Sequence, residues 1–126
     1  MPKKISQQFH PAVGTHIIAD LFGCKNINDN EAVKSIISQS AVVSKATVLS
    51  EQFHEFEPQG LTGYILLAES HISIHTWPEV GYAAVDVFTC GDTIQPQKAI
   101  NYIIEKLVPN SQNLRVLTRS NTPFVS

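Results

Sequence analysis

Six reactive side chains gather between residues 69 and 79, more densely than anywhere else in this chain of 126 residues. They are Glu69, Ser70, His71, Ser73, His75 and Glu79. If this stretch is a strand, His71, Ser73 and His75 share one face, because successive side chains alternate between the two sides of a strand. Ile72 and Ile74 then point into the core. Two imidazoles and a hydroxyl on one surface can do acid–base chemistry near neutral pH.

Three other interpretations fit part of this cluster. Histidines on a half-buried strand are often held by hydrogen bonds and have no chemical role. His71 and His75, together with His54 or His16, could bind zinc, although the chain has no paired cysteines and no His-Glu-x-x-His helix spacing. A serine nucleophile paired with a histidine base would need a Gly-x-Ser-x-Gly elbow, and no serine has one. Residue types and spacing therefore leave the chemistry open.

Hydrophobic spacing predicts the elements that must position these side chains. An apolar run indicates a first strand over residues 13–22, which stops at a glycine. Candidate N-caps at residues 28–30, followed by apolar residues at helical spacing, predict a helix through about Ser40. Alternation predicts a strand over residues 45–56. A third strand region is expected over residues 63–76, interrupted where the reactive cluster begins.

The second half of the chain continues in the same way. Residues 81–90 alternate and indicate a strand, and residues 96–108 have the apolar spacing of a helix that Pro109 closes. Residues 114–117 are expected to be a last strand. The predicted order is β-α-β-β-β-α-β, an α+β two-layer sandwich in which two helices cover one face of a mostly antiparallel sheet. With no repeat or low-complexity linker, residues 1–126 are expected to be a single domain.

Composition excludes several classes of function. A hydrophobic content of 43% is enough for one core, and a net charge of −2 lacks the basic excess that a nucleic-acid partner would require. Cys24 and Cys90 are expected to be free thiols, because two cysteines do not make a disulfide framework. No apolar run approaches ~20 residues and no export signal follows the first lysines, so we expect a cytosolic protein that does not enter a membrane.

Longer strings of sequence resemble one family of enzymes. Residues 68–79 read AESHISIHTWPE, which closely resembles the processing signature of the short prokaryotic S-adenosylmethionine decarboxylase proenzymes. The supporting matches are Gly14-Thr15-His16 with Asp20, Phe56 followed by Gly60-Leu61-Thr62-Gly63, and Val85-Asp86-Val87-Phe88-Thr89-Cys90-Gly91. Together they cover most of the chain. A Glu-Ser pair alone would carry no information, whereas this block followed by Thr-Cys-Gly is specific.

The resemblance implies that the chain cleaves itself. In the family, the serine after the glutamate attacks the preceding carbonyl, so Ser70 would convert the Glu69–Ser70 peptide bond into an ester. The base that then removes the Ser70 α-hydrogen corresponds to His75, and an imidazole suits that task near neutral pH. Elimination and loss of ammonia would leave a covalent pyruvoyl group at position 70. The products would be a chain of residues 1–69 and a pyruvoyl chain of residues 70–126.

The same resemblance implies how the mature enzyme works. The pyruvoyl ketone forms a Schiff base with the amine of S-adenosylmethionine and takes up the electrons that departing CO2 leaves. The proton donor corresponds to Cys90, because a thiol is mostly protonated at neutral pH. Phe56 is placed to stack on adenine or face the sulfonium, and Glu79 to bind the ribose hydroxyls. The product would be the aminopropyl donor for spermidine and polyamine synthesis, made by a homodimer of cleaved protomers.

Two points stay open at the level of sequence. The family commonly has serine in the Gly-x-Ser-Gly turn that supports processing, and this chain has Thr62, whose methyl branch restricts rotation of its hydroxyl. The Glu-Ser junction, His75 and Cys90 specify a reaction and not a substrate, so a pyruvoyl-dependent decarboxylase of another amino acid such as arginine is an alternative. An uncleaved relative without enzymatic activity is the other.

Overall fold

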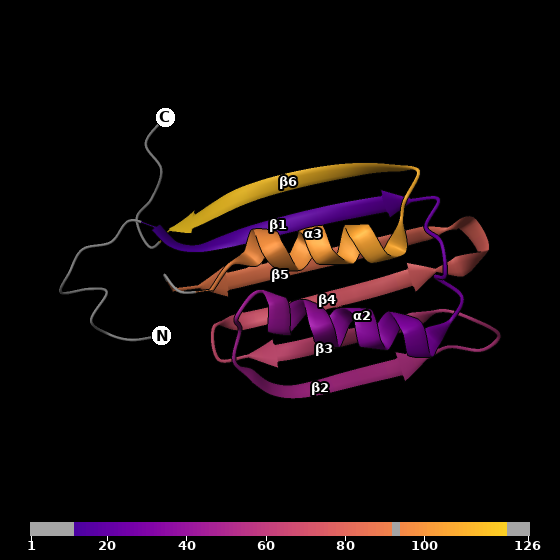
Figure 1. Cartoon of the computed structure of the whole chain (residues 1–126), viewed down its shortest axis with the longest axis horizontal. Coiled ribbons are helices and arrows are strands. Elements are labelled where there is room, and N and C mark those ends of the chain that lie inside the picture. Colours follow the sequence, from indigo (N-terminus) through magenta and orange to yellow (C-terminus); the bar gives the residue numbers. More distant parts are fainter. Residues whose placement is uncertain (1–11, 92–93, 121–126) are drawn as a thin grey trace.

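Six strands form one antiparallel sheet, and two helices lie across a single face of it (Figure 1). The computed structural model describes residues 12–91 and 94–120. The order of strands across the sheet is β2-β3-β4-β5-β1-β6, and every neighbouring pair is antiparallel. The elements are β1 (Ala12–Phe22), α2 (Asn30–Val43), β2 (Val48–Glu55), β3 (Leu61–Leu67), β4 (Ser70–Trp77), η1 (Pro78–Val80), β5 (Tyr82–Cys90), α3 (Pro96–Leu107) and β6 (Ser111–Ser120). The predicted α+β two-layer sandwich is confirmed.

Local signals explain where the two helices begin and end. The Asp29 side chain caps α2 by accepting a hydrogen bond from the backbone N–H of Ala32 at 3.1 Å. Pro96 opens α3, where its missing N–H costs nothing, and the helix ends at Leu107, followed by the C-cap residue Val108 in a left-handed conformation. Of the helices in the described residues, neither is long and apolar enough to cross a membrane.

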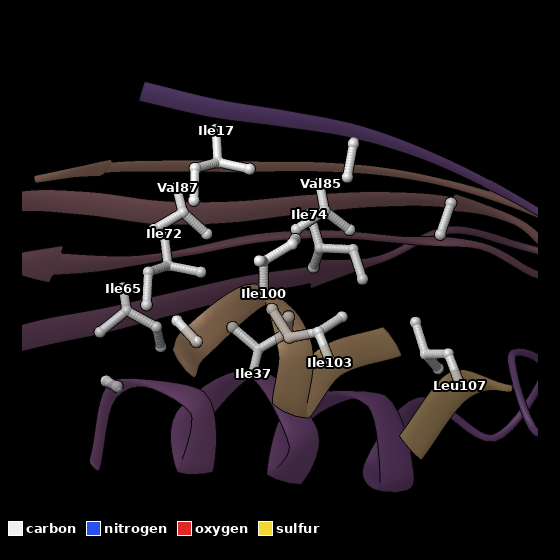
Figure 2. Close-up of a cluster of buried hydrophobic side chains, with 14 of the residues drawn as sticks. Ile17, Ile37, Ile65, Ile72, Ile74, Val85, Val87, Ile100, Ile103 and Leu107 are labelled. Carbon is white, nitrogen blue, oxygen red and sulfur yellow. The ribbon is translucent and has the colours of Figure 1, made fainter. Parts of the chain in front are cut away.

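The core lies between the helices and one face of the sheet. Strands β3, β4 and β5 bury every second side chain, as the period of two requires. The apolar side chains that meet there include Ile37, Ile100, Ile103 and Leu107 from the helices and Ile17, Ile65, Ile72, Ile74, Val85 and Val87 from the sheet (Figure 2). Each contributes about 1.5–3 kcal/mol by leaving water. We call the other face of the sheet the open face, because none of the helices in the part of the chain that the structure describes lies over it (Figure 1).

The prediction of one interrupted strand region over residues 63–76 is wrong. This segment is a hairpin of two strands, β3 and β4, joined by a tight turn at Ala68 and Glu69. The turn contains no glycine or proline, so the usual sequence signal of a turn is missing there. The last strand is also longer than residues 114–117. Strand β6 pairs with β1 along its whole length, but it is a sheet edge with exposed, mostly polar residues that show no apolar pattern.

Because the core lies on one side of α2, two truncations on this helix should change the free energy of unfolding by very different amounts. Ile37→Ala removes a fully buried side chain and should lower the free energy of unfolding by about 2–5 kcal/mol. Val42→Ala, on the same helix but 60% exposed, is the control and should change it by less than about 0.5 kcal/mol. Urea unfolding followed by circular dichroism measures both, in a Ser70→Ala background that lacks the serine at the expected cleavage site. Equal losses for the two variants would contradict this core.

Candidate active site

The turn between β3 and β4 holds the Glu69–Ser70 bond in an unusual conformation. Ser70 has a φ of 146°, a region that side-chain-bearing residues rarely adopt. Such a conformation costs on the order of 1–3 kcal/mol and persists only where the surroundings hold it in place. Ser70 begins β4 and pairs with Leu67 on one side and Thr89 on the other. The bond that the sequence marked for cleavage is therefore a strained point of the backbone.

Cys90 meets both residues of this bond. Its backbone N–H donates a hydrogen bond of 2.9 Å to the Glu69 carbonyl oxygen. Its Sγ lies 3.5 Å from Ser70 Oγ, and both side chains are half-buried. A backbone N–H aimed at a carbonyl oxygen can stabilise negative charge that develops there during attack on the carbon. We call Glu69, Ser70 and Cys90 the junction group.

A second group lies at the other end of β4. His75 Nδ1 is 3.0 Å from the hydroxyl of Thr62, and the two residues pair directly across β3 and β4. Phe56, 47% exposed, follows β2 at this end, and its N–H bonds to the Gly60 carbonyl at 2.9 Å. Glu79 is exposed in the short turn η1 that follows β4. We call Phe56, Thr62, His75 and Glu79 the histidine group.

One chain does not bring these two groups together. Ser70 and His75 are the first and sixth residues of β4, which at about 3.3 Å per residue puts their backbones about 16 Å apart. A base must lie within hydrogen-bond reach of the proton that it removes, so His75 cannot act on Ser70 of its own chain in this conformation. All seven site residues that the sequence singled out belong to one group or the other.

A charged cluster that the sequence did not predict lies on the open face between β1, β4, β5 and β6. Asp86 bonds to His16 Nε2 and lies 3.4 Å from His71 Nε2, while Arg119 Nη1 is 3.2 Å from His16 Nδ1. A guanidinium can only donate, so Nδ1 of His16 accepts and its proton is on Nε2, facing Asp86. Separations of 70 and 103 residues hide these pairs in the sequence.

This cluster borders a shallow cavity of about 260 Å³ in the middle of the open face. Its lining includes His16, Asp20, Ser73, His75 and Asp86. His71, Ser73 and His75 share this face, as predicted, but the two imidazoles have separate partners, Asp86 and Thr62. Within residues 12–91 and 94–120, no three His, Cys, Asp or Glu side chains are grouped so that they could hold a metal ion.

The two cysteines are both free, as the sequence predicted. Cys24 is half-buried after β1, and this burial raises the pKa of its thiol above the ordinary value. Its backbone N–H bonds to the Gly81 carbonyl at 2.9 Å, at the end of the sheet away from Cys90. The burial disfavours a thiolate at Cys24. Of the two thiols, Cys90 is the one that lies beside Ser70.

Comparisons with known proteins agree with the resemblance seen in the sequence. The sequence profile of S-adenosylmethionine decarboxylase matches residues 15–120. The S-adenosylmethionine decarboxylase proenzyme of Thermoanaerobacter sp. strain X514 is 52% identical over 105 residues, 82% of this chain and 83% of the relative. The proenzyme of Clostridium tetani is 50% identical over 104 residues, 81% of each chain.

A solved structure is similar over nearly the whole fold. The crystal structure of the adenosylmethionine decarboxylase from Aquifex aeolicus superposes with a TM-score of 0.84 at 39% sequence identity, and the match covers 93% of this chain and 98% of that one. An antiparallel sheet with two helices on one face is thus the fold of a known adenosylmethionine decarboxylase. The chain belongs to the S-adenosylmethionine decarboxylase family, and the prediction of a decarboxylase is confirmed.

Tyr82 offers a direct test of the open-face geometry. Its hydroxyl donates to Asp20 at 2.6 Å, and this bond, with a smaller contribution from burial, raises the pKa of Tyr82 above its ordinary value. Asp20→Asn should lower that pKa toward about 10, as seen by ultraviolet titration of phenolate against a Tyr82→Phe blank. The bond stabilises the fold below the unfolded pKa and is lost as pH rises through the folded one. An unmoved pKa would contradict the contact.

Proposed function

We propose that this chain is an S-adenosylmethionine decarboxylase proenzyme that cleaves itself between Glu69 and Ser70. The pyruvoyl group formed at position 70 then serves decarboxylation of S-adenosylmethionine to the aminopropyl donor for polyamine synthesis. The observation that carries the proposal is the junction group: a strained Ser70 whose neighbouring carbonyl already accepts the Cys90 N–H at 2.9 Å. The names of the relatives favour S-adenosylmethionine over arginine as the substrate.

The first step is a shift of the acyl group from nitrogen to oxygen. Ser70 Oγ adds to the Glu69 carbonyl carbon, and the Cys90 N–H bonds to the oxygen that becomes negative. The bond to the Ser70 nitrogen then breaks, the hydroxyl proton ends on that nitrogen, and an ester replaces the peptide bond. Breaking this bond also frees the strained φ of Ser70, so relief of strain favours the forward direction.

The second step is an elimination that needs a base. Removing the Ser70 α-hydrogen expels the Glu69 carboxylate and leaves a dehydroalanine, which tautomerises, takes up water and loses ammonia to give the pyruvoyl group. We assign the base to His75, with Thr62 orienting its ring through Nδ1 at 3.0 Å. Threonine keeps the hydroxyl that this contact uses. Because about 16 Å separates Ser70 from His75 within a chain, the base comes from a second copy.

A homodimer with its open faces in contact provides that second copy. A two-fold axis across the middle of β4 reverses the strand, so His75 of the partner subunit faces Ser70, and the reverse pair forms by symmetry. Large apolar side chains exposed on the open face support such packing, because large exposed apolar patches mark protein–protein interaction sites. They are Phe22, Tyr64, Leu66, Trp77 and Leu117, each 38–43% exposed.

In turnover, the pyruvoyl group condenses with the substrate amine and accepts the electron pair that CO2 leaves behind. Cys90 Sγ lies 3.5 Å from Ser70 Oγ, close enough to donate a proton there, and is assigned the protonation of carbon. Phe56 and Glu79, exposed in the histidine group, are assigned the adenine and the ribose. The dimer brings them to the junction group together with His75.

Cys90→Ala separates processing from turnover, because the backbone N–H stays while the thiol goes. We expect cleavage into two fragments to continue and CO2 release from S-adenosylmethionine to fall by about 10²–10⁴-fold, the usual contribution of a positioned acid. The matched control is Cys24→Ala, which removes the other free thiol. Gel electrophoresis follows cleavage and labelled CO2 follows turnover. Unchanged activity of Cys90→Ala would exclude this thiol as the acid.

Co-expression of two inactive variants tests the shared site. Alone, Ser70→Ala lacks the nucleophile and His75→Ala lacks the base, so both should stay full-length. In mixed dimers, the His75→Ala chain keeps its Ser70 and meets His75 of the partner subunit, so only that chain should be cut. Tags of different length identify the cut chain on a gel. Cleavage of His75→Ala on its own, or no cleavage in the mixture, would contradict a site completed by the second copy.

A further inference from the structure

We propose that Thr47 is a positioning residue for self-cleavage, which holds the Glu69 side chain so that the Glu69 carbonyl carbon stays in place for attack by Ser70. The inference rests on the proposed self-cleavage and adds a residue to it. Thr47 lies in the loop between α2 and β2, 22 positions before the bond to be cut.

Thr47 holds the turn through three hydrogen bonds. Its backbone N–H donates to Glu69 Oε1 at 3.1 Å, and its hydroxyl donates to Glu69 Oε2 at 3.1 Å. Its carbonyl accepts the N–H of Ala68 at 2.9 Å. Both carboxylate oxygens are engaged by one residue, which fixes the orientation of the side chain as well as its position, and bonds to an ionised acceptor are the stronger kind.

Glu69 is thereby held from two directions. Thr47 holds its carboxylate, and the N–H of Cys90 holds its carbonyl oxygen from the β5 side. A strained φ such as that of Ser70 relaxes unless neighbouring contacts fix the residues beside it. The two contacts together leave the Glu69 carbonyl little freedom to rotate away from Ser70 Oγ. The rate at which Ser70 Oγ attacks the Glu69 carbonyl carbon depends strongly on this orientation.

The turn itself does not account for a glutamate at this position. Tight turns favour glycine, asparagine or aspartate, which adopt turn conformations or bond to their own backbone. Glu69 instead reaches across to another loop, and the hydroxyl that it meets is exposed at the surface. The contact between Thr47 and Glu69 neither fills the core nor forms the turn. It fixes the residue before the strained bond, and we infer that its role is to keep that bond in place.

The test compares the rates at which freshly made chains are cut. Thr47→Val keeps the shape but loses the hydroxyl donor, and it should slow the appearance of the 70–126 fragment about tenfold, the effect expected for one bond to a charged group. Thr47→Ser restores the donor and should cleave within about twofold of wild type. The control is Ser38→Ala, which removes another hydroxyl-to-carboxylate bond, to Glu51 at 2.9 Å, and should cleave at the wild-type rate.

Hydroxylamine identifies the step that is slowed. It attacks the Glu69 carbonyl of the ester and frees Ser70 as an amino terminus, so it speeds cleavage only where ester is present. If Thr47 positions the carbonyl for the first attack, Thr47→Val forms little ester and hydroxylamine should leave its cleavage slow. Rapid cleavage of Thr47→Val with hydroxylamine would overturn the proposal, as would wild-type cleavage without it, or a Thr47→Ser variant as slow as Thr47→Val.

A second variant covers the case in which Thr47→Val does not fold, which circular dichroism would reveal. Glu69→Gln keeps the size of the side chain but weakens both bonds from Thr47. It should also slow cleavage about tenfold and stay insensitive to hydroxylamine, and a wild-type rate would overturn the proposal. Failure of the proposed function looks different, because the wild-type chain itself would then remain uncut.

Discussion

The sheet is buried by helices on one face only, and both the core and the reactive surface follow from this arrangement. Strands β3, β4 and β5 place every second side chain under α2 and α3, and these buried positions are aliphatic apart from Gly63, Thr76 and Thr89. The alternation that builds the core leaves the intervening positions on the open face, where histidines, an aspartate and exposed aromatic rings gather. The alternation of side chains along the strands thus gives both the stable core and the reactive surface.

The length of β4 keeps the two halves of the candidate site apart. A strand rises about 3.3 Å per residue, so the junction group and the histidine group cannot meet within one chain, however their side chains rotate. We propose that the symmetry of a dimer solves this problem, because a two-fold axis across β4 brings each junction to the opposite histidine. On this account the exposed aromatic and aliphatic side chains of the open face and the chemistry of the site are parts of one interface, and dimerisation precedes maturation.

Much of the fold could be predicted from the sequence, and the failures have physical causes. Strand β1, both helices and the alternation of β5 follow from local apolar spacing. The hairpin at Ala68 and Glu69 could not, because Thr47 and Cys90 hold the turn through contacts distant in sequence. The residues of the junction group and the histidine group were identified by resemblance to the family. The distance between the two groups could not be predicted and became clear only from their positions along β4. The His16–Asp86–Arg119 cluster joins three strands and left no local signal.

We propose that the strained bond before Ser70 is consumed to make a pyruvoyl group. Intact mass spectrometry of freshly purified wild-type protein should then show two fragments. They are residues 1–69 and a second chain lighter by one ammonia than residues 70–126 released by simple hydrolysis, with an amino terminus blocked to Edman degradation. A single intact mass of 13.9 kDa would contradict self-cleavage, and a second chain that begins with serine would contradict the pyruvoyl group.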